Sequence, residues 1–274
     1  MYIEQGSLDD AMCVKQFVEK CDKVIWETEH FNTSEITRSY NNLYRSFVSN
    51  VEFLNVIKDK TLQKRFYVEN GIDTLPFVCG IKDRDYSIVL EHNDKTICVY
   101  SNIKGLVIKD SSIVVKDRFG GYDGKGVNII TYDDLSKRGL SELEGVNVLI
   151  EYNLKNKIEL SYIIGTQQGR SYSYDLVAME FEPKCNVLKE CYPASIVLKQ
   201  AYNKAINWAH DVYTKILVST VMYQYGWEGI MAIEMFYDTL NQKLYVNEIA
   251  PRVHNSAHHT IHSHDLSQFE MIAR

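Results

Sequence analysis

Positive charge is in short supply in this sequence, and long uncharged runs are missing. Its 30 Lys and Arg residues face 36 Asp and Glu residues, which gives a formal net charge of −6. The chain therefore lacks the basic field that holds a nucleic acid or an anionic membrane. The longest uncharged stretch of the C-terminal half, Ile216 to Trp227, is too short to span a bilayer. We expect no nucleic acid and no membrane as a partner.

Targeting signals, paired cysteines and prolines are scarce as well. Met1 leads straight into Glu4, Asp9 and Asp10, so no secretory or transit signal is visible, which predicts a cytoplasmic protein. The six cysteines contain no CxxC pair, and this is the spacing that zinc sites use. With four prolines and no low-complexity tract, the composition marks no domain boundary.

What the sequence does contain is typical of a globular protein with mixed secondary structure. Hydrophobic residues make up 45% and charged residues 24% of the 274 residues, which excludes disorder, coiled coil and collagen. Apolar spacing predicts a helix over 61–70, ended by Gly71, and a long amphipathic helix that includes 197–212. Strands are predicted at 24–26, 85–90, 97–100, 113–116, 147–151, 159–164, 226–237 and 243–249. The expected fold class is α+β or α/β.

A glycine-rich segment follows one of these strands. Residues 116–126 read KDRFGGYDGKG, with four glycines in the last seven positions. Such a loop exposes backbone N–H groups that fold over phosphate oxygens, and Lys116 and Lys125 supply positive charge. It is not a Walker loop, because Lys125 is followed by Gly126 rather than by Ser or Thr. The alternative interpretation is a plain hairpin tip.

Two acidic residues lie on the last two predicted strands. An antiparallel hairpin centred on Asn241 places Glu234 opposite Glu248 on one face. Carboxylates held that close share a proton or a cation, and hard oxygen ligands favour Mg²⁺. The alternative is an exposed pair that Lys243 or Arg252 neutralises.

A proline turn after the last strand gathers polar side chains. Residues 247–258 read NEIAPRVHNSAH, and the turn presents Arg252, His254, Asn255 and Ser256 together. These side chains suit phosphate and other polar substrate groups. Five of the eight histidines fall between His254 and His264, but no HExxH motif accompanies them, so catalytic zinc is disfavoured.

Glu151 and Glu159 give a weaker signal. Glu151 ends an apolar strand, whose edge would present backbone groups to an adenine, and Glu159 begins the next strand, where it would accept ribose hydroxyls. Without a family for comparison, both would be interpreted as surface acids.

Taken together, these segments closely resemble the N5-carboxyaminoimidazole ribonucleotide synthetase family, the ATP-grasp enzymes of purine biosynthesis. Supporting similarities at 27–30, 59–60, 71–77, 229–234 and 267–270 occur in family order. The resemblance implies an ATP-grasp fold in which two α+β subdomains hold ATP between them. It also implies a truncated N-terminal α/β domain at 1–57 and an ATP-grasp domain at 58–274, with subdomains at about 75–150 and 151–274.

The family's activity follows as an expectation. The resemblance implies a carbon–nitrogen ligase in which ATP activates bicarbonate as carboxyphosphate, which then carboxylates 5-aminoimidazole ribonucleotide to N5-carboxyaminoimidazole ribonucleotide. The implied cofactors are ATP and Mg²⁺ or Mn²⁺, with bicarbonate as co-substrate. Its partners would be these small molecules, with a homodimer or a second chain that supplies missing regions.

The resemblance also assigns roles by position. The implied catalytic residues are Lys116 and Arg252, and the implied metal ligands are Glu234 and Glu248. ATP-binding residues would be Lys60, Lys116, Gly121, Tyr122, Asp123, Gly124, Lys125, Gly126, Val127, Glu151, Tyr152, Asn153, Leu154, Glu159, Asn247 and Glu248. Substrate-binding residues would be Glu27, Glu29, Arg252, His254, Asn255 and Ser256.

Some features depart from the family pattern. The chain is expected to begin after the family's glycine-rich first strand, and to stop at Arg274 before a small C-terminal domain that carries basic residues. Lys60 stands where arginine is usual, and Ala257 where glycine is usual. Two further hypotheses are an ATP-binding remnant or partial subunit without independent turnover, and an ATP-grasp ligase with another acceptor.

Overall fold

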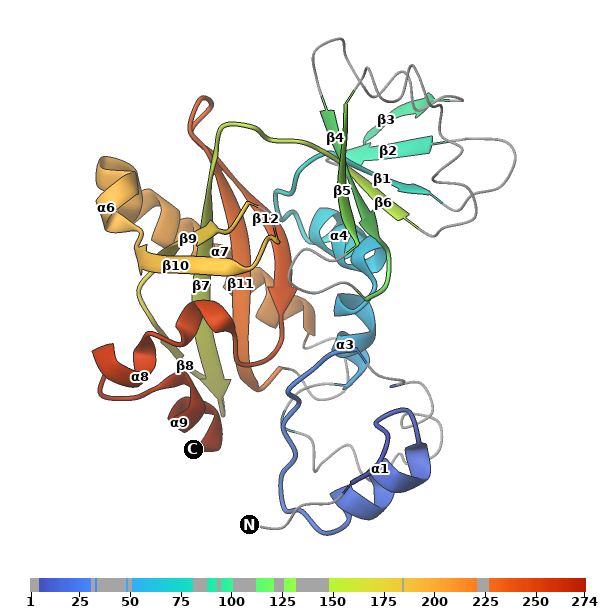
Figure 1. Cartoon of the computed structure of the whole chain (residues 1–274), viewed down its shortest axis with the longest axis vertical. Helices are drawn as coiled ribbons and strands as arrows, with labels where there is room; N and C mark the ends of the chain where they lie inside the picture. Colours follow the sequence, from blue (N-terminus) through green and yellow to red (C-terminus); the bar gives the residue numbers. More distant parts are fainter. Residues whose placement is uncertain are drawn as a thin grey trace.

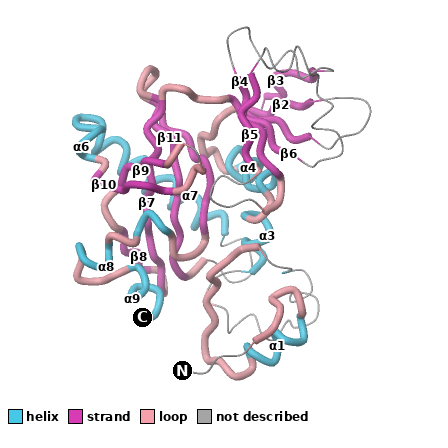
Figure 2. The backbone as a smooth tube through the Cα atoms, viewed as in Figure 1, coloured by secondary structure: helices cyan, strands magenta, loops and turns pink. Residues whose placement is uncertain are grey.

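Two antiparallel sheets and the helices beside them make up the part of the chain that the structure describes (Figures 1 and 2). This computed structural model describes residues 5–30, 33, 48, 51–80, 88–92, 95–100, 112–120, 126–131, 148–183, 185–220 and 227–274. The expected α+β class is confirmed. The domain division near residue 57 and the subdomain bounds stay predictions.

The first sheet has the strand order β3-β2-β1-β6-β4-β5. Its strands are β1 (Phe77–Gly80), β2 (Ile88–His92), β3 (Lys95–Tyr100), β4 (Ser112–Asp117), β5 (Val127–Thr131) and β6 (Val148–Tyr152). The pairing of β4 with β5 is antiparallel, with Lys116 opposite Val127. The two strands therefore bring both ends of the glycine-rich segment together.

The second sheet has the order β10-β9-β7-β11-β12, and β8 pairs with β7. Its strands are β7 (Lys157–Gln167), β8 (Arg170–Ser173), β9 (Val177–Phe181), β10 (Leu188–Pro193), β11 (Gly229–Asp238) and β12 (Lys243–Ala250). Seven of the eight predicted strands overlap observed ones, whereas residues 24–26 form only an isolated bridge at Val24. Five strands in the described part of the chain were not predicted: β1, β5, β8, β9 and β10. All four residues of β8 are exposed, so no apolar alternation marks that strand.

The helices are α1 (Ala11–Val18), α3 (Val51–Ile57), α4 (Lys60–Glu69), α6 (Ser195–Leu198), α7 (Tyr202–Thr220), α8 (Thr260–Ser263) and α9 (Gln268–Ala273), with short 3₁₀ turns at Lys199–Ala201 and Asn255–Ala257. The predicted helix through 197–212 is interrupted, because Lys199 takes a left-handed φ of 48°. The regular helix α7 therefore starts only at Tyr202.

Helix α4 begins and ends as its sequence predicts. The Asp59 carboxylate accepts from the backbone N–H groups of Thr61 and Leu62 at 3.0 and 3.3 Å, a typical N-cap. At the other end Gly71 has φ +60°, and the N–H of Ile72 donates to the Tyr67 carbonyl at 2.8 Å. This is a Schellman ending, which requires the left-handed conformation that glycine adopts at little cost.

The main core lies on one face of the second sheet. Met231, Ile233 and Met235 of β11 point into it and pack with α7 and α4. Since side chains alternate along a strand, the residues between them, Ala232 and Glu234, face the opposite way. That face carries a smaller apolar cluster beside α9 and, next to it, the polar side chains described below.

The sheets are joined through the segment after α4. Thr74 donates to the Val246 carbonyl at 2.7 Å, and the Val246 N–H donates to the Asp73 carbonyl at 2.8 Å. Figure 1 shows α4 between the first sheet and β12.

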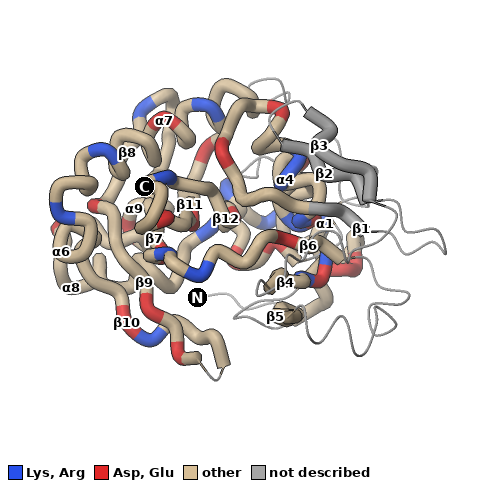
Figure 3. The backbone as a smooth tube through the Cα atoms, turned by 90° about the horizontal axis from the view of Figure 1, so that it is seen from above, with Lys and Arg blue, Asp and Glu red and all other residues tan. Residues whose placement is uncertain are grey.

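Seen from above, Lys/Arg and Asp/Glu positions are interspersed over the described elements (Figure 3). Among the described residues, we find no helix whose length and apolar character would let it traverse a bilayer.

Candidate active site

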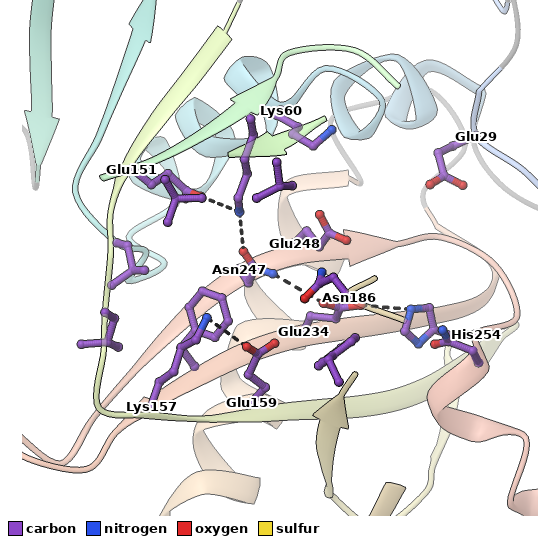
Figure 4. A pocket seen from close by; sticks show the side chains of 18 of the residues that line it. Glu29, Lys60, Glu151, Lys157, Glu159, Asn186, Glu234, Asn247, Glu248 and His254 are labelled. Carbon is purple, nitrogen blue, oxygen red and sulfur yellow. Dashed lines mark hydrogen bonds and ion pairs between the residues drawn. The ribbon is translucent and has the colours of Figure 1, made fainter. Parts of the chain in front are cut away.

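A cavity of about 820 Å³ lies where the two sheets face each other (Figure 4). Strands β4, β5 and β6 line it from the first sheet, and β7, β11 and β12 line it from the second. Residues 27–30 and the segment that follows β12 close one end. Side chains far apart in the sequence therefore converge on one space.

Glu234 and Glu248 lie directly opposite each other on β11 and β12, as the sequence predicts. The turn itself is centred half a residue earlier than Asn241, because Asp238 faces Lys243. Continued without interruption, that register would place Glu234 opposite Asn247. A bulge between Glu234 and Met235 shifts the pairing by one residue and restores the acidic pair.

The bulge also explains why two consecutive residues reach the cavity. In a regular strand Asn247 and Glu248 would point to opposite faces, but a bulge sets two residues against one. Both line the cavity, and the Asn247 amide nitrogen lies 3.4 Å from Glu234 Oε2. Three oxygen-bearing side chains thus meet on one side of the space.

The two carboxylates differ in electrostatic character. Burial disfavours ionisation of Glu234, but His254, whose Nε2 lies 3.1 Å from Oε1, acts together with Lys116 and Asn247 to outweigh burial and lower the pKa. For Glu248, burial and the charge of Glu234 both act in the same direction and raise the pKa. A cation between them would relieve this repulsion. Two carboxylates are also the number of protein ligands that Mg²⁺ commonly takes, so the residues fit that ion.

Two lysines occupy the opposite side of the cavity. The Lys116 Nζ lies 2.5 Å from Glu151 Oε2 and 2.9 Å from Asn247 Oδ1. Burial opposes its charge, but Glu151, helped by Glu248 and Glu234, raises the pKa of Lys116. The Lys60 ammonium donates to the Gly120 carbonyl at 2.5 Å, and burial lowers its pKa. Both lysines line the cavity, where their charges suit an anionic ligand.

Glu151 is not a surface acid. Its side chain is 2% exposed and bridges two ammonium groups, Lys116 and Lys64, the latter 2.6 Å from Oε1. Burial works against its ionisation, yet the two lysines lower its pKa to about 2. The sequence analysis missed Lys64. The available signal was its place one turn before Tyr67 on α4, on the face that packs into the core.

Acidification should remove stability through this carboxylate. Because the folded pKa of Glu151 is about 2 rather than the ordinary 4.5, its contribution is fully present above about pH 4.5 and is lost as the pH falls toward 2. At pH 7 we expect Glu151→Gln to lower the free energy of unfolding by about 3 to 5 kcal/mol.

Urea unfolding of the wild type and the variant at pH 7 and at pH 3 tests this expectation. The difference between the two proteins should shrink at pH 3, where the wild type has lost part of the contribution. An unchanged difference at both pH values would show that the ion pairs are not its source.

Apolar side chains from both sheets line the third side of the cavity. Leu154 packs with Leu75 and Phe236, and Ile129 of β5 faces the cavity while 62% exposed. The chain around Tyr152 is held by its N–H, which donates to the Pro76 carbonyl at 3.0 Å. This combination of apolar walls and strand-edge backbone suits a flat aromatic ring.

The remaining residues predicted for adenine and ribose lie along the same wall. Asn153 donates from Nδ2 to Ser112 Oγ at 2.8 Å. Glu159 lies 2.9 Å from the Lys157 ammonium, which sits 4.0 Å from the centre of the Phe236 ring. Figure 4 shows both charged side chains directed toward the cavity.

The glycine-rich segment is described only at its two ends. Gly121, Tyr122, Asp123, Gly124 and Lys125 lie outside the described residues. At the base of the segment, the Asp117 N–H donates to the Gly126 carbonyl at 2.8 Å. Gly126 has φ +75°, and a Cβ there would collide with the Asp117 carboxylate, so this position requires glycine.

Residues predicted to bind substrate gather at the end of the cavity near 27–30. Arg252 Nε donates to Glu29 Oε2 at 2.6 Å. Burial opposes both charges, but their mutual attraction lowers the pKa of Glu29 and raises that of Arg252. Glu27, His254 and Asn255 also line the cavity.

Ser256 lies beneath His254 and does not face the cavity. It is fully buried, and its hydroxyl is 2.8 Å from both His254 Nδ1 and Ser161 Oγ. In this position Ser256 supports His254, and the substrate contact that the resemblance implied stays a prediction. The sequence analysis also missed a ring pair at the rim, where His258 stacks on Phe269 with centroids 6.0 Å apart.

Comparison with known proteins agrees with this geometry. An ATP-grasp domain is matched over residues 80–269. The chain belongs to the ATP-grasp family. The ATP-grasp fold expected from the sequence is thereby confirmed.

Individual ATP-grasp proteins bear out the resemblance noted from the sequence. An N5-carboxyaminoimidazole ribonucleotide synthase of Staphylococcus aureus is 27% identical over 97% of this chain and 63% of its own length. The ADP complex of the Staphylococcus aureus synthetase superposes with a TM-score of 0.76 at 26% identity, over 98% of this chain and 64% of that one. The ATP complex of the Aspergillus clavatus synthase has a TM-score of 0.79 at 22% identity, over the same shares. The chain thus spans somewhat under two thirds of these relatives.

Proposed function

We propose that this ATP-grasp chain binds ATP with a divalent cation in the cavity and uses it to carboxylate 5-aminoimidazole ribonucleotide. One observation carries the proposal: Lys60 and Lys116 line the same space as Glu234 and Glu248, beside an apolar wall. Lysines on one side and a cation site on the other suit a polyphosphate between them. The name and the similarity of the Staphylococcus aureus relative support the choice of acceptor.

The nucleotide would lie along the wall formed by β6 and β7. Its base would fit the apolar side near Leu154 and Ile129, and its ribose hydroxyls would reach Glu159. The phosphates would then extend toward Lys60 and Lys116, beneath the glycine-rich segment. The residues Gly121, Tyr122, Asp123, Gly124, Lys125, Gly126 and Val127 are proposed to cover them.

The metal would be held by Glu234 and Glu248. Bound there, Mg²⁺ or Mn²⁺ would neutralise phosphate charge and act as a Lewis acid. Asn247 would fix the position of Lys116 relative to Glu234, because its side chain contacts both. The protein would contribute to catalysis by fixing the positions of these side chains and by excluding water from the cavity.

The acceptor end would bind bicarbonate and the ribonucleotide. In the proposed sequence, a bicarbonate oxygen attacks the γ-phosphorus of ATP, so that carboxyphosphate forms and ADP leaves. The ribonucleotide amine then attacks the carboxyl carbon and phosphate departs. Arg252 would stabilise the developing negative charge, and Glu29 fixes its orientation. His254, Asn255, Glu27 and Glu29 would contact the acceptor, and Ser256 supports His254.

ADP release tests the proposal. With ATP, Mg²⁺ and bicarbonate present, we expect release that depends on added 5-aminoimidazole ribonucleotide and disappears in carbonate-free buffer. Binding of ATP without turnover would favour a remnant or a subunit that needs a second chain. Turnover only with a different acceptor would favour another ATP-grasp ligase. The cytoplasmic location and the homodimer belong to the same proposal.

A further inference from the structure

Lys64 is a buried ammonium that the proposed reaction does not use directly. Its side chain is 2% exposed, and it is absent from the cavity lining. Three acceptors surround its Nζ: Glu151 Oε1 at 2.6 Å, Thr74 Oγ1 at 2.7 Å and the Val246 carbonyl at 3.4 Å. An ammonium has three hydrogens to donate, one for each of these acceptors, and the Glu151 carboxylate offsets part of the burial that lowers the pKa of Lys64.

The carboxylate of Glu151 is shared between this lysine and Lys116. One oxygen faces Lys64 and the other faces Lys116, at 2.6 and 2.5 Å. The three side chains together carry one net positive charge. Interactions between charges are strong away from water. The net charge of this group therefore determines how strongly Lys116 attracts an anion in the cavity.

Removing the charge of Lys64 would change that balance. Glu151 would then have Lys116 as its counter-ion, and the net charge of the group would fall to zero. Both carboxylate oxygens would also be free to turn toward Lys116, which Asn247 holds from the other side at 2.9 Å. The ammonium would be drawn away from the cavity, and its field there would be cancelled.

We propose that Lys64 is a charge-balancing, positioning residue, which occupies half of the Glu151 carboxylate and so leaves the positive charge of Lys116 available to the phosphates of the nucleotide. This inference rests on the proposed function, since it presumes that Lys116 faces the phosphates. It assigns a role in nucleotide affinity to a side chain that does not reach the ligand.

Binding of ATP and of adenosine to Lys64→Met tests the inference. We expect ATP to bind roughly 30-fold more weakly, the effect of about 2 kcal/mol found when one partner of a buried charge pair is removed. Adenosine has no phosphate, so its affinity should change less than about threefold. Equal weakening of both ligands would mean that Lys64 merely maintains the shape of the site, and would overturn the inference.

A double variant provides the decisive comparison. Lys64→Met with Glu151→Gln removes the anion as well, which returns the net charge of the group to one positive unit. ATP affinity should recover at least about tenfold relative to Lys64→Met. A double variant that binds ATP no better than the single variant would overturn the inference.

If Lys64→Met does not fold, Lys64→Gln replaces it. If neither folds, the double variant should bind ATP within about threefold of the wild type, and a loss above about 30-fold would count against the inference.

A matched exposed pair serves as control. Lys215 and Asp211 form an i,i+4 pair at 3.1 Å on α7, outside the cavity. Lys215→Met and Lys215→Met with Asp211→Asn make the same charge changes, and neither should alter ATP affinity more than about twofold.

A wild type that binds no ATP would refute the proposed function itself. A wild type that binds ATP, with Lys64→Met unchanged, would refute only the role of Lys64.

Discussion

Glu248→Gln is expected to abolish metal-dependent turnover while making the ligand-free protein more stable. Turnover should fall at least about a thousandfold, because the cation that offsets phosphate charge would lose a ligand. Stability should rise by about 1 kcal/mol at pH 7, because two carboxylates directly opposite each other on paired strands repel. Loss of function with a gain in stability is typical of a strained active site.

The sign of the stability effect follows from the pKa of Glu248, which is raised by burial and by Glu234. A raised carboxyl pKa means that the folded state favours the protonated form. The ionised side chain therefore costs stability as the pH rises above the ordinary value of 4.5. The gain from Glu248→Gln should be present near neutral pH and vanish near pH 4. Thermal unfolding at both pH values measures it.

Glu234→Gln should also abolish turnover, but with the opposite effect on stability. Burial opposes its ionisation, but His254, Lys116 and Asn247 together lower its pKa, so the ionised form stabilises the fold at neutral pH. Glu180→Gln on β9 is a control, since this residue is outside the cavity and accepts from Tyr192 at 2.7 Å. Full activity in both Glu234→Gln and Glu248→Gln would remove the metal assignment.

Lys116→Met is expected to cause the second large loss. Turnover should fall about 100- to 1000-fold, the usual effect of deleting one preorganised donor to a developing charge. ATP affinity should weaken with it, because the proposed function has Lys116 meet phosphate in the ground state as well. The fold should persist, since Glu151 keeps its contact with Lys64 at 2.6 Å.

Steady-state kinetics and ATP titration of Lys116→Met separate these effects. Lys189→Met is the charge control, because Lys189 pairs with Glu190 on the surface at 3.4 Å with both side chains more than half exposed. The control should retain wild-type kinetics. A destabilised Lys116→Met that still binds ATP with wild-type affinity would show that this lysine serves the fold rather than the nucleotide.

The pairing of Glu234 with Glu248 could be predicted from local sequence pattern. Two alternating strands with a short polar connection were enough to predict a hairpin, and the hairpin placed Glu234 opposite Glu248. The turn was nevertheless misplaced by half a residue, and a bulge compensated for it. A bulge has no reliable sequence signature, because it depends on how the strand packs against its neighbours. The presence of Asn247 and Glu248 on the same side therefore required the structure.

The contact between Lys64 and Glu151 could not be predicted from local sequence pattern. Lys64 and Glu151 are 87 positions apart, and each has an ordinary explanation as a surface charge when read alone. Their contact exists because β6 of the first sheet meets α4 away from water. Ser256 is a similar case: the motif that contains it was recognised, but its position beneath His254 depends on Ser161 of a distant strand.

The sequence by itself determined the fold class, the strands that carry the acidic pair, the capped helix α4 and the family resemblance, because these follow from periodicity, turn chemistry and short motifs within neighbouring residues. The tertiary structure alone decided which charges are buried together. Burial and charge pairing depend on contacts between segments distant in the chain. They determine that Glu151 is shared by two lysines and that Glu234 and Glu248, although chemically alike, have pKa values displaced in opposite directions.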